Sequence, residues 1–276
     1  MPYASLMVSV AVGRSNKALL QSVSDLADIF HSGVIGVAAC RPIQTAHPSY
    51  SVPAKLFDED RKQISMQLRA AEAEYRAALP ARISRVEWRS CTTLLPISDH
   101  LAREARGADI VVVGVDRGSS PPDATRQLDV RALVMQIGRP VLIVPEAAAG
   151  TTFDNILVGW KETREAQRAV ADALPFLMQA KQVTVAAIAA KDELTEVRNQ
   201  VADVVSWLGH HGVDAQFLVR APRGAHANEL NAIAGELGSS LVVAGAYGYF
   251  REREWVLGGV TTDLLQPTMR CSLLSR

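Results

Sequence analysis

Short apolar runs alternate along the whole chain with longer stretches in which apolar positions recur every three or four residues. The runs are apolar at nearly every position and rich in β-branched residues, which is typical of strands buried on both faces of a parallel sheet. The strands expected from this pattern are Leu6–Val12, Val34–Cys40, Ser84–Arg89, Ile110–Gly114, Val141–Val144, Ile156–Trp160, Val183–Ile188, Ala215–Val219, Leu241–Gly245 and Ser272–Ser275.

The stretches between these strands have the periodicity of amphipathic helices. The helices expected from it are Asn16–Phe30, Asp60–Ala78, Ser98–Arg106, Arg164–Gln179, Glu193–Gly209, Ala227–Leu237 and Val260–Gln266. Strands that alternate with helices form parallel sheets through right-handed crossovers, with helices on both faces. The pattern therefore predicts an α/β protein made of two tandem flavodoxin-like doubly wound domains, each with a five-stranded parallel sheet.

An internal repeat divides the pattern into two copies. The segment ADIVVVGVDRG resembles SSLVVAGAYGY, and a single offset along the chain aligns Ile110 with Leu241 and Arg139 with Arg270. The small and polar segment EAAAGTT joins the copies, and a chain of 276 residues is long enough for two domains. We therefore expect one domain over 1–146 and a second over 153–276.

Charge and apolar run length exclude several classes of partner. The 29 basic and 29 acidic residues cancel, so the chain has no electrostatic footprint for nucleic acid or for an anionic membrane. The longest apolar run near the start, Leu6–Val12, is too short to span a membrane, and no basic residue precedes it as in a signal peptide. A cytoplasmic location is therefore expected.

Metal sites and disulfides are not expected either. The cysteines Cys40, Cys91 and Cys271 are odd in number and far apart, and they form no cluster with histidines at zinc-ligand spacing. We interpret all three as small core residues. The adjacent pair His210 and His211 suits the end of a helix better than a metal site.

Glycines after the fourth strand of the second copy carry the strongest functional signal. Gly245 and Gly248 come at the carboxyl end of that strand, where ligands of doubly wound sheets bind. Gly258 and Gly259 then precede the helix expected over 260–266, whose free N–H groups suit an anion. The spacing predicts a loop that holds a phosphate group through backbone amides.

Two interpretations of this loop stay open from the residues alone. The glycines could bind phosphate, or they could only make a turn and a break before a helix. Arg251 could reach a distal phosphate, or it could belong to a solvated run of charges. The first copy places Arg117 opposite Gly248, and its loop carries two prolines that lack N–H donors, so a phosphate site is expected only in the second copy.

The spacing G-x2-G-x9-G after the fourth strand, in a domain of this layout, resembles the universal stress protein family, and the duplicated chain resembles its tandem type. The resemblance implies ATP binding at this loop. The residues that it assigns to phosphate and ribose are Gly245, Gly248, Gly258, Gly259 and Val260. It also implies that the two copies pair through their last strands as an intramolecular pseudo-dimer, and the chain could form a homodimer.

Two positions depart from the family pattern. Gly259 stands where the family has a serine or threonine that helps to hold phosphate, and Lys161 stands where it has an aspartate at the end of the first strand. Lys161 and Thr163 are expected on the opposite wall of the site. Lys161 could reach a phosphate, or it could spoil the nucleoside pocket by replacing an acceptor with a donor, and we favour the second.

No catalytic motif is readable, because the chain has no GxSxG, HExxH or Walker A sequence. The sequence therefore favours a non-enzymatic stress-response or regulatory protein that binds one ATP or other adenine nucleotide in its C-terminal domain. A protein-interaction module that has lost nucleotide binding is the alternative. A slow ATPase that uses a loop arginine is a weaker one, because no carboxylate base is readable beside the glycines.

Overall fold

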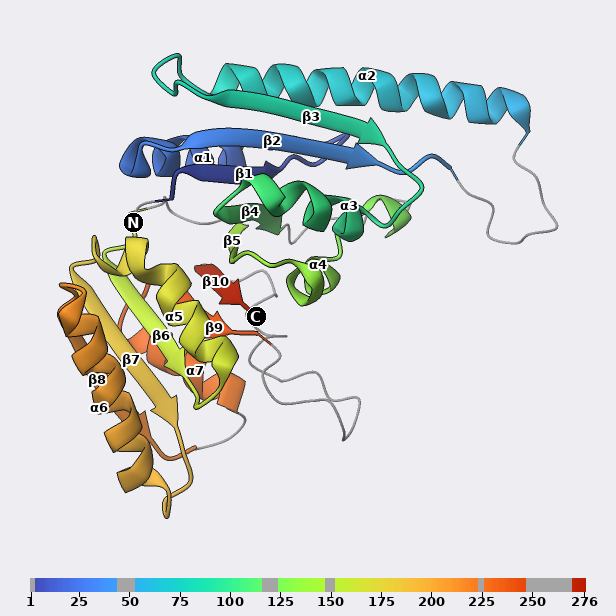
Figure 1. Ribbon diagram of the computed structural model, residues 1–276. Helices are drawn as coiled ribbons and strands as arrows, with labels where there is room; N and C mark the ends of the chain where they lie inside the picture. The colour runs from blue at the N-terminus through green and yellow to red at the C-terminus, as the bar shows by residue number, and fades with distance from the viewer. Residues whose placement is uncertain (1–2, 44–52, 116–123, 147–151, 223–225, 247–269) are drawn as a thin grey trace. The chain divides into compact units, whose positions relative to one another are not determined.

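The computed structural model describes residues 3–43, 53–115, 124–146, 152–222, 226–246 and 270–276 (Figure 1). The chain divides into two compact units, a first unit over Tyr3–Gly138 and a second over Arg139–Arg276. No helix among the described residues is both long and apolar enough to cross a membrane.

The first unit is a parallel sheet with the strand order β3-β2-β1-β4. Its elements are β1 (Ser5–Ser9), α1 (Lys17–Phe30), β2 (Gly33–Cys40), α2 (Ala54–Ala78), β3 (Val86–Thr92), α3 (Ile97–Glu104), the 3-10 turn η1 (Ala105–Gly107), β4 (Ile110–Val115), the 3-10 turn η2 (Ala124–Arg126) and α4 (Val130–Gln136).

The second unit has the strand order β5-β10-β9-β6-β7-β8. The strands from β10 to β8 are parallel, and β5 pairs antiparallel with β10. Its elements are β5 (Val141–Pro145), β6 (Asn155–Trp160), α5 (Arg164–Leu177), β7 (Gln182–Ile188), α6 (Leu194–His210), β8 (Ala215–Arg220), α7 (His226–Glu236), β9 (Leu241–Gly245) and β10 (Cys271–Ser275).

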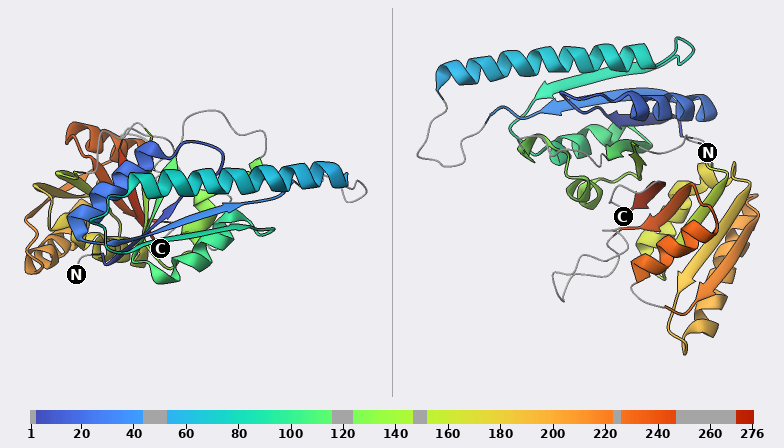
Figure 2. Two further views of the ribbon diagram at one scale, coloured as in Figure 1. Left: turned by 90° about the horizontal axis from the view of Figure 1, so that it is seen from above. Right: turned by 180° about the vertical axis from the view of Figure 1, so that it is seen from behind.

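Helices cover both faces of the second unit's sheet. Figures 1 and 2 show it from opposite sides, with α5 and α6 on one face and α7 on the other. Because the sheet is covered twice, its central strands are buried at nearly every position, as the apolar runs of the sequence predict.

The predicted fold class is confirmed. In both units the first strand of the copy lies beside the fourth, with Leu6 opposite Ile110 in the first unit and Ile156 opposite Leu241 in the second. The last strands of the two copies, β5 and β10, pair within the second unit. The predicted domain boundaries, the pseudo-dimer and the homodimer stay predictions.

The structure moves several predicted boundaries. Strand β3 runs over Val86–Thr92 instead of 84–89, and α2 begins at Ala54, six positions before the predicted start at Asp60. Both extensions are rich in polar, exposed residues, so the apolar pattern does not mark them. The helix predicted over 260–266 lies outside the described residues.

A buried tyrosine ties α2 to the sheet of the first unit. Tyr75 packs on Trp88 at a ring-centroid distance of 5.2 Å, and a Cβ at Gly36 would lie only 2.7 Å from the tyrosine ring. The Tyr75 hydroxyl lies 2.9 Å from the backbone oxygen of Val34 and 3.0 Å from that of Glu87. The glycine thus makes room for a ring whose hydroxyl is shared between β2 and β3.

We expect Tyr75→Phe to lower the free energy of unfolding by about 1–2 kcal/mol, because two buried carbonyl oxygens lose their donor. Urea denaturation of the full chain measures this change. An unchanged midpoint and slope would contradict the role assigned to the hydroxyl.

Stability at high pH offers a second measurement on the same variant. Burial raises the pKa of Tyr75 above its ordinary value of 10.0. The unfolded chain therefore releases this proton first, so the contribution of Tyr75 is complete below pH 10 and falls as the pH rises above it. Between about pH 9 and 11, Tyr75→Phe should lose less stability than the parent chain.

Candidate functional site

The strand order of the second unit reverses between β6 and β9. From β6 the chain passes outward to β7 and β8, whereas β9 and β10 lie on the other side of β6. Gly159 of β6 lies opposite Ala244 of β9, so both strands end at the same edge of the sheet. Ligands of doubly wound sheets bind at such a switch point, outside the carboxyl ends of the strands.

Gly245 lies where this edge meets the first turn of α5. A Cβ at this position would lie 2.5 Å from the backbone nitrogen of Ala166 and 2.6 Å from the carbonyl carbon of Glu165. Only a glycine allows the helix to approach the strand this closely, because both neighbours are backbone atoms. The structure therefore accounts for this glycine by packing, independently of any phosphate.

Thr163 is the N-cap of α5. Its backbone is extended, with φ −145° and ψ 151°, and its side-chain oxygen accepts a hydrogen bond of 3.2 Å from the backbone nitrogen of Ala166. The backbone nitrogen of Thr163 donates to the carbonyl oxygen of Lys161 at 2.7 Å. The positive end of the α5 dipole therefore lies at the same edge as the exposed side chain of Lys161.

A buried carboxylate at this edge was missed by sequence reasoning. Glu165 is only 4% exposed, and Arg164 Nε donates to its Oε1 at 2.7 Å. Burial by itself raises the pKa of Glu165, but hydrogen bonds from Arg164 and from its own backbone, with the charges of Arg164 and Arg276, hold the net value below normal. The sequence does contain a signal for Glu165, because acidic residues are favoured in the first turn of a helix.

The edge also includes an unsatisfied hydroxyl. Ser275 ends β10 beside Gly245 of β9, and it is 1% exposed. Its Oγ has no hydrogen-bond partner among the described residues. A buried polar atom without a partner is unfavourable, and it is a common feature of sites that water or a ligand completes.

Three of the predicted site residues are therefore close to one another in the fold. Lys161 and Thr163 follow β6, and Gly245 ends the neighbouring strand β9. The remaining predicted residues lie outside the described part of the chain: Gly248, Arg251, Gly258, Gly259 and Val260. Within that part, no group of His, Cys, Asp or Glu side chains could hold a metal ion.

Known structures share this fold over the whole chain, whereas no family model and no curated protein matches the sequence. A universal stress protein from Archaeoglobus fulgidus DSM 4304 superposes with a TM-score of 0.72 and 11% identity, covering 99% of this chain and 98% of its own. A functionally unknown protein from Pseudomonas aeruginosa PAO1 superposes with a TM-score of 0.60 and 14% identity, covering 99% and 92%. At these identities the likeness establishes the fold.

Proposed function

We propose that this chain is a cytoplasmic, non-enzymatic regulatory protein of the universal stress protein type, and that its second unit binds one adenine nucleotide, with ATP as the first candidate. The bound nucleotide would lie at the carboxyl edge between β6 and β9. Full-length similarity to a universal stress protein fold supports the type of protein.

The observation that carries the nucleotide proposal is the convergence of Lys161, Thr163 and Gly245 on the switch point of the sheet. An exposed ammonium and a helix N-terminus lie there together, and both attract an anion. The glycine spacing that follows Gly245 in the sequence supports the same ligand class.

The described residues fit a phosphate better than a nucleoside. Lys161 has three N–H donors and no acceptor, so it can bind phosphate oxygens but cannot accept from ribose hydroxyls. The buried carboxylate at the edge, that of Glu165, is already bonded to Arg164. We therefore expect the phosphates to supply most of the affinity at this site.

The same carboxylate supports a non-enzymatic role. General-base catalysis of hydrolysis needs a carboxylate or imidazole that can take a proton from water. The hydrogen bonds and charges that lower the pKa of Glu165 also make it a weak base. The proposal therefore assigns binding to this edge and no turnover.

Lys161→Asp tests the site by reversing the charge beside the nucleotide. We expect this variant to bind ATP at least tenfold more weakly, which corresponds to about 1.4 kcal/mol, because a carboxylate repels the phosphates. It should bind adenosine more tightly, because the carboxylate restores an acceptor for ribose. Titration calorimetry measures both affinities, and the parent chain should bind one ATP and release no phosphate above background.

Lys181→Asp is the matched control. Lys181 is also exposed, but it precedes β7 at the opposite edge of the sheet, where it pairs with Asp154 at 2.7 Å. Its replacement should leave both affinities unchanged. If Lys161→Asp changes neither affinity, the nucleotide does not bind at this edge, and if the parent chain binds no nucleotide, an interaction module becomes the better function.

A further inference from the structure

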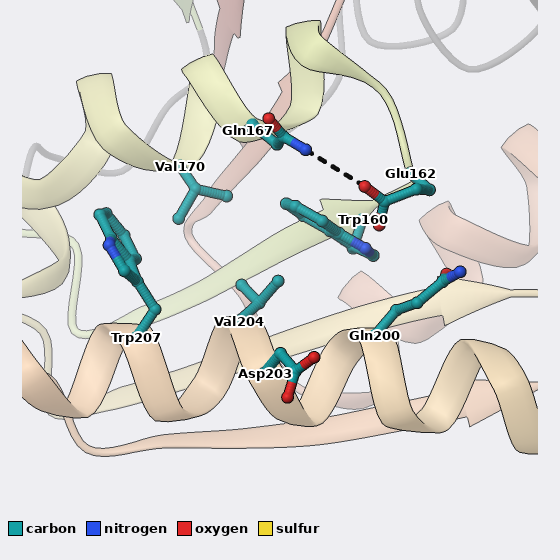
Figure 3. Close-up of a pocket in the computed structure, with 8 residues that line it drawn as sticks. All are labelled: Trp160, Glu162, Gln167, Val170, Gln200, Asp203, Val204 and Trp207. Carbon is teal, nitrogen blue, oxygen red and sulfur yellow. Dashed lines mark hydrogen bonds between the residues drawn. The ribbon is translucent and has the colours of Figure 1, made fainter.

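A groove of about 500 Å³ lies between α5 and α6 of the second unit (Figure 3). Two tryptophans line it, Trp160 from the end of β6 and Trp207 from α6, and Val170 and Val204 lie between them. The volume is in the range of small-molecule sites, and the two indole rings form part of its walls.

The indole nitrogen of Trp160 is a donor that meets no acceptor among the residues that the structure describes. The residue is 8% exposed, and its Nε1 has no hydrogen-bond partner in the described part of the chain. Figure 3 shows the nitrogen-bearing edge of the ring on the side of Glu162 and Gln200, within the groove. Because buried donors are nearly always paired, this N–H would be stabilised by an acceptor bound beside it in the groove.

The polar side chains of the groove make it acidic. Glu162 accepts a hydrogen bond of 3.1 Å from the neutral amide of Gln167, and Asp203 lies on the opposite wall. Among the described residues, no Lys, Arg or His lines the groove and neither carboxylate has a cationic partner. The groove therefore combines aromatic faces, two uncompensated negative charges and one unused donor.

We propose that this groove binds a small organic ammonium compound that also has a hydrogen-bond acceptor, such as a hydroxyl group. Tryptophan offers the strongest cation–π face among the side chains, and carboxylates nearby add to the attraction for a cation. The acceptor of the ligand would receive the N–H of Trp160. This site is separate in chemistry from the anion-attracting edge at Lys161.

In the first unit, hydrogen bonds join the corresponding helices α1 and α2. Glu74 of α2 accepts hydrogen bonds from the backbone nitrogen of Asn16 at 2.9 Å and from its side-chain nitrogen at 3.2 Å. These bonds join α2 to the start of α1.

Three probes separate the proposed contacts: choline, its neutral isostere 3,3-dimethylbutan-1-ol, and the smaller cation tetramethylammonium, which has no hydroxyl. Titration of the full chain, followed by calorimetry or ligand-observed NMR, measures their affinities. We expect the neutral alcohol to bind about tenfold more weakly than choline, because it lacks the charge that the rings and carboxylates attract. Equal affinities would reduce the groove to an apolar crevice and overturn the proposal.

Substitutions in the groove test which residues contact the charge and the hydroxyl group of choline. Trp160→Phe keeps an aromatic ring but removes the N–H, so it should weaken choline several-fold and tetramethylammonium less, because tetramethylammonium loses only part of the cation–π attraction. Trp207→Leu, on a half-exposed helix face, should weaken both cations, as should Asp203→Asn. Trp88→Phe, whose Nε1 is also buried without a described partner but lies in the first unit, is the control that should change neither.

Other results of these titrations would contradict the proposed ammonium site. Failure of the folded parent chain to bind choline at millimolar concentration would overturn the proposal, and so would equal effects of Trp88→Phe and Trp160→Phe. If Trp160→Phe weakens choline and tetramethylammonium alike, the N–H does not receive the acceptor and that contact is wrong. Circular dichroism of each variant establishes that it is folded.

Discussion

Gly245→Ala is expected to lower the free energy of unfolding by about 2–3 kcal/mol, near the upper end for overpacked sites. The new methyl group would lie 2.5 Å from the nitrogen of Ala166 and 2.9 Å from its Cα, in the first turn of α5. Both neighbours belong to the backbone, so no side-chain rotation can relieve the contact. The helix itself would have to move away from β9.

Gly209→Ala is the matched control for this experiment. Gly209 lies inside α6, and a Cβ there would have no neighbour within 4 Å. Alanine is a better helix former than glycine, so this variant should be neutral or more stable by about 0.5–1 kcal/mol. Urea denaturation compares the two. If Gly245→Ala is as stable as the parent chain, α5 and β9 are not packed as described.

This prediction also affects how nucleotide binding is tested. Because Gly245 is required for packing, a variant there that loses nucleotide binding would not by itself show contact with phosphate. Lys161 is exposed and can be replaced without disturbing the core, so its charge reversal tests the ligand more directly.

Asp60→Ala is expected to lower the free energy of unfolding by about 2–3 kcal/mol, because it removes an acceptor from two groups at once. Asp60 is 9% exposed on α2. Its Oδ2 accepts from the backbone nitrogen of Ile43 at 2.8 Å, and its Oδ1 accepts from Arg126 at 2.6 Å. The carboxylate thus joins α2, the chain after β2 and the turn η2.

Asp58→Ala separates this effect from the general loss of an acid on α2. Asp58 is exposed and lies two residues before Asp60. Its replacement should change the free energy of unfolding by no more than about 0.5 kcal/mol, which is usual for surface substitutions. Equal midpoints for the two variants in urea would contradict the bridging role of Asp60.

The fold was largely predictable because burial leaves a local signature. A strand covered on both faces must be apolar at consecutive positions, and a helix on one face must be apolar at every third or fourth. The runs at 156–160 and 241–245 therefore predict β6 and β9 with the bounds that the structure has, apart from the first residue of β6. Polar ends, such as those of β3 and α2, have no such signature, and there the prediction was wrong by several residues.

Part of the candidate site was also predictable, because the apolar pattern locates the ends of the strands. A residue that follows an apolar strand in a doubly wound fold must lie at the carboxyl edge, so Lys161, Thr163 and Gly245 could be placed there from the sequence. Their chemistry could also be read, since an ammonium, a hydroxyl and a missing Cβ are properties of the residues themselves.

The sequence by itself thus determined the order of strands and helices, their buried positions and the edge at which ligands are expected. Only the tertiary structure decided which segments meet there. It placed the first turn of α5 against Gly245, buried the carboxylate of Glu165, and left a groove between Trp160 and Trp207. The physical reason is that an apolar pattern specifies how deeply a residue is buried, whereas its neighbours depend on packing between segments far apart in the chain.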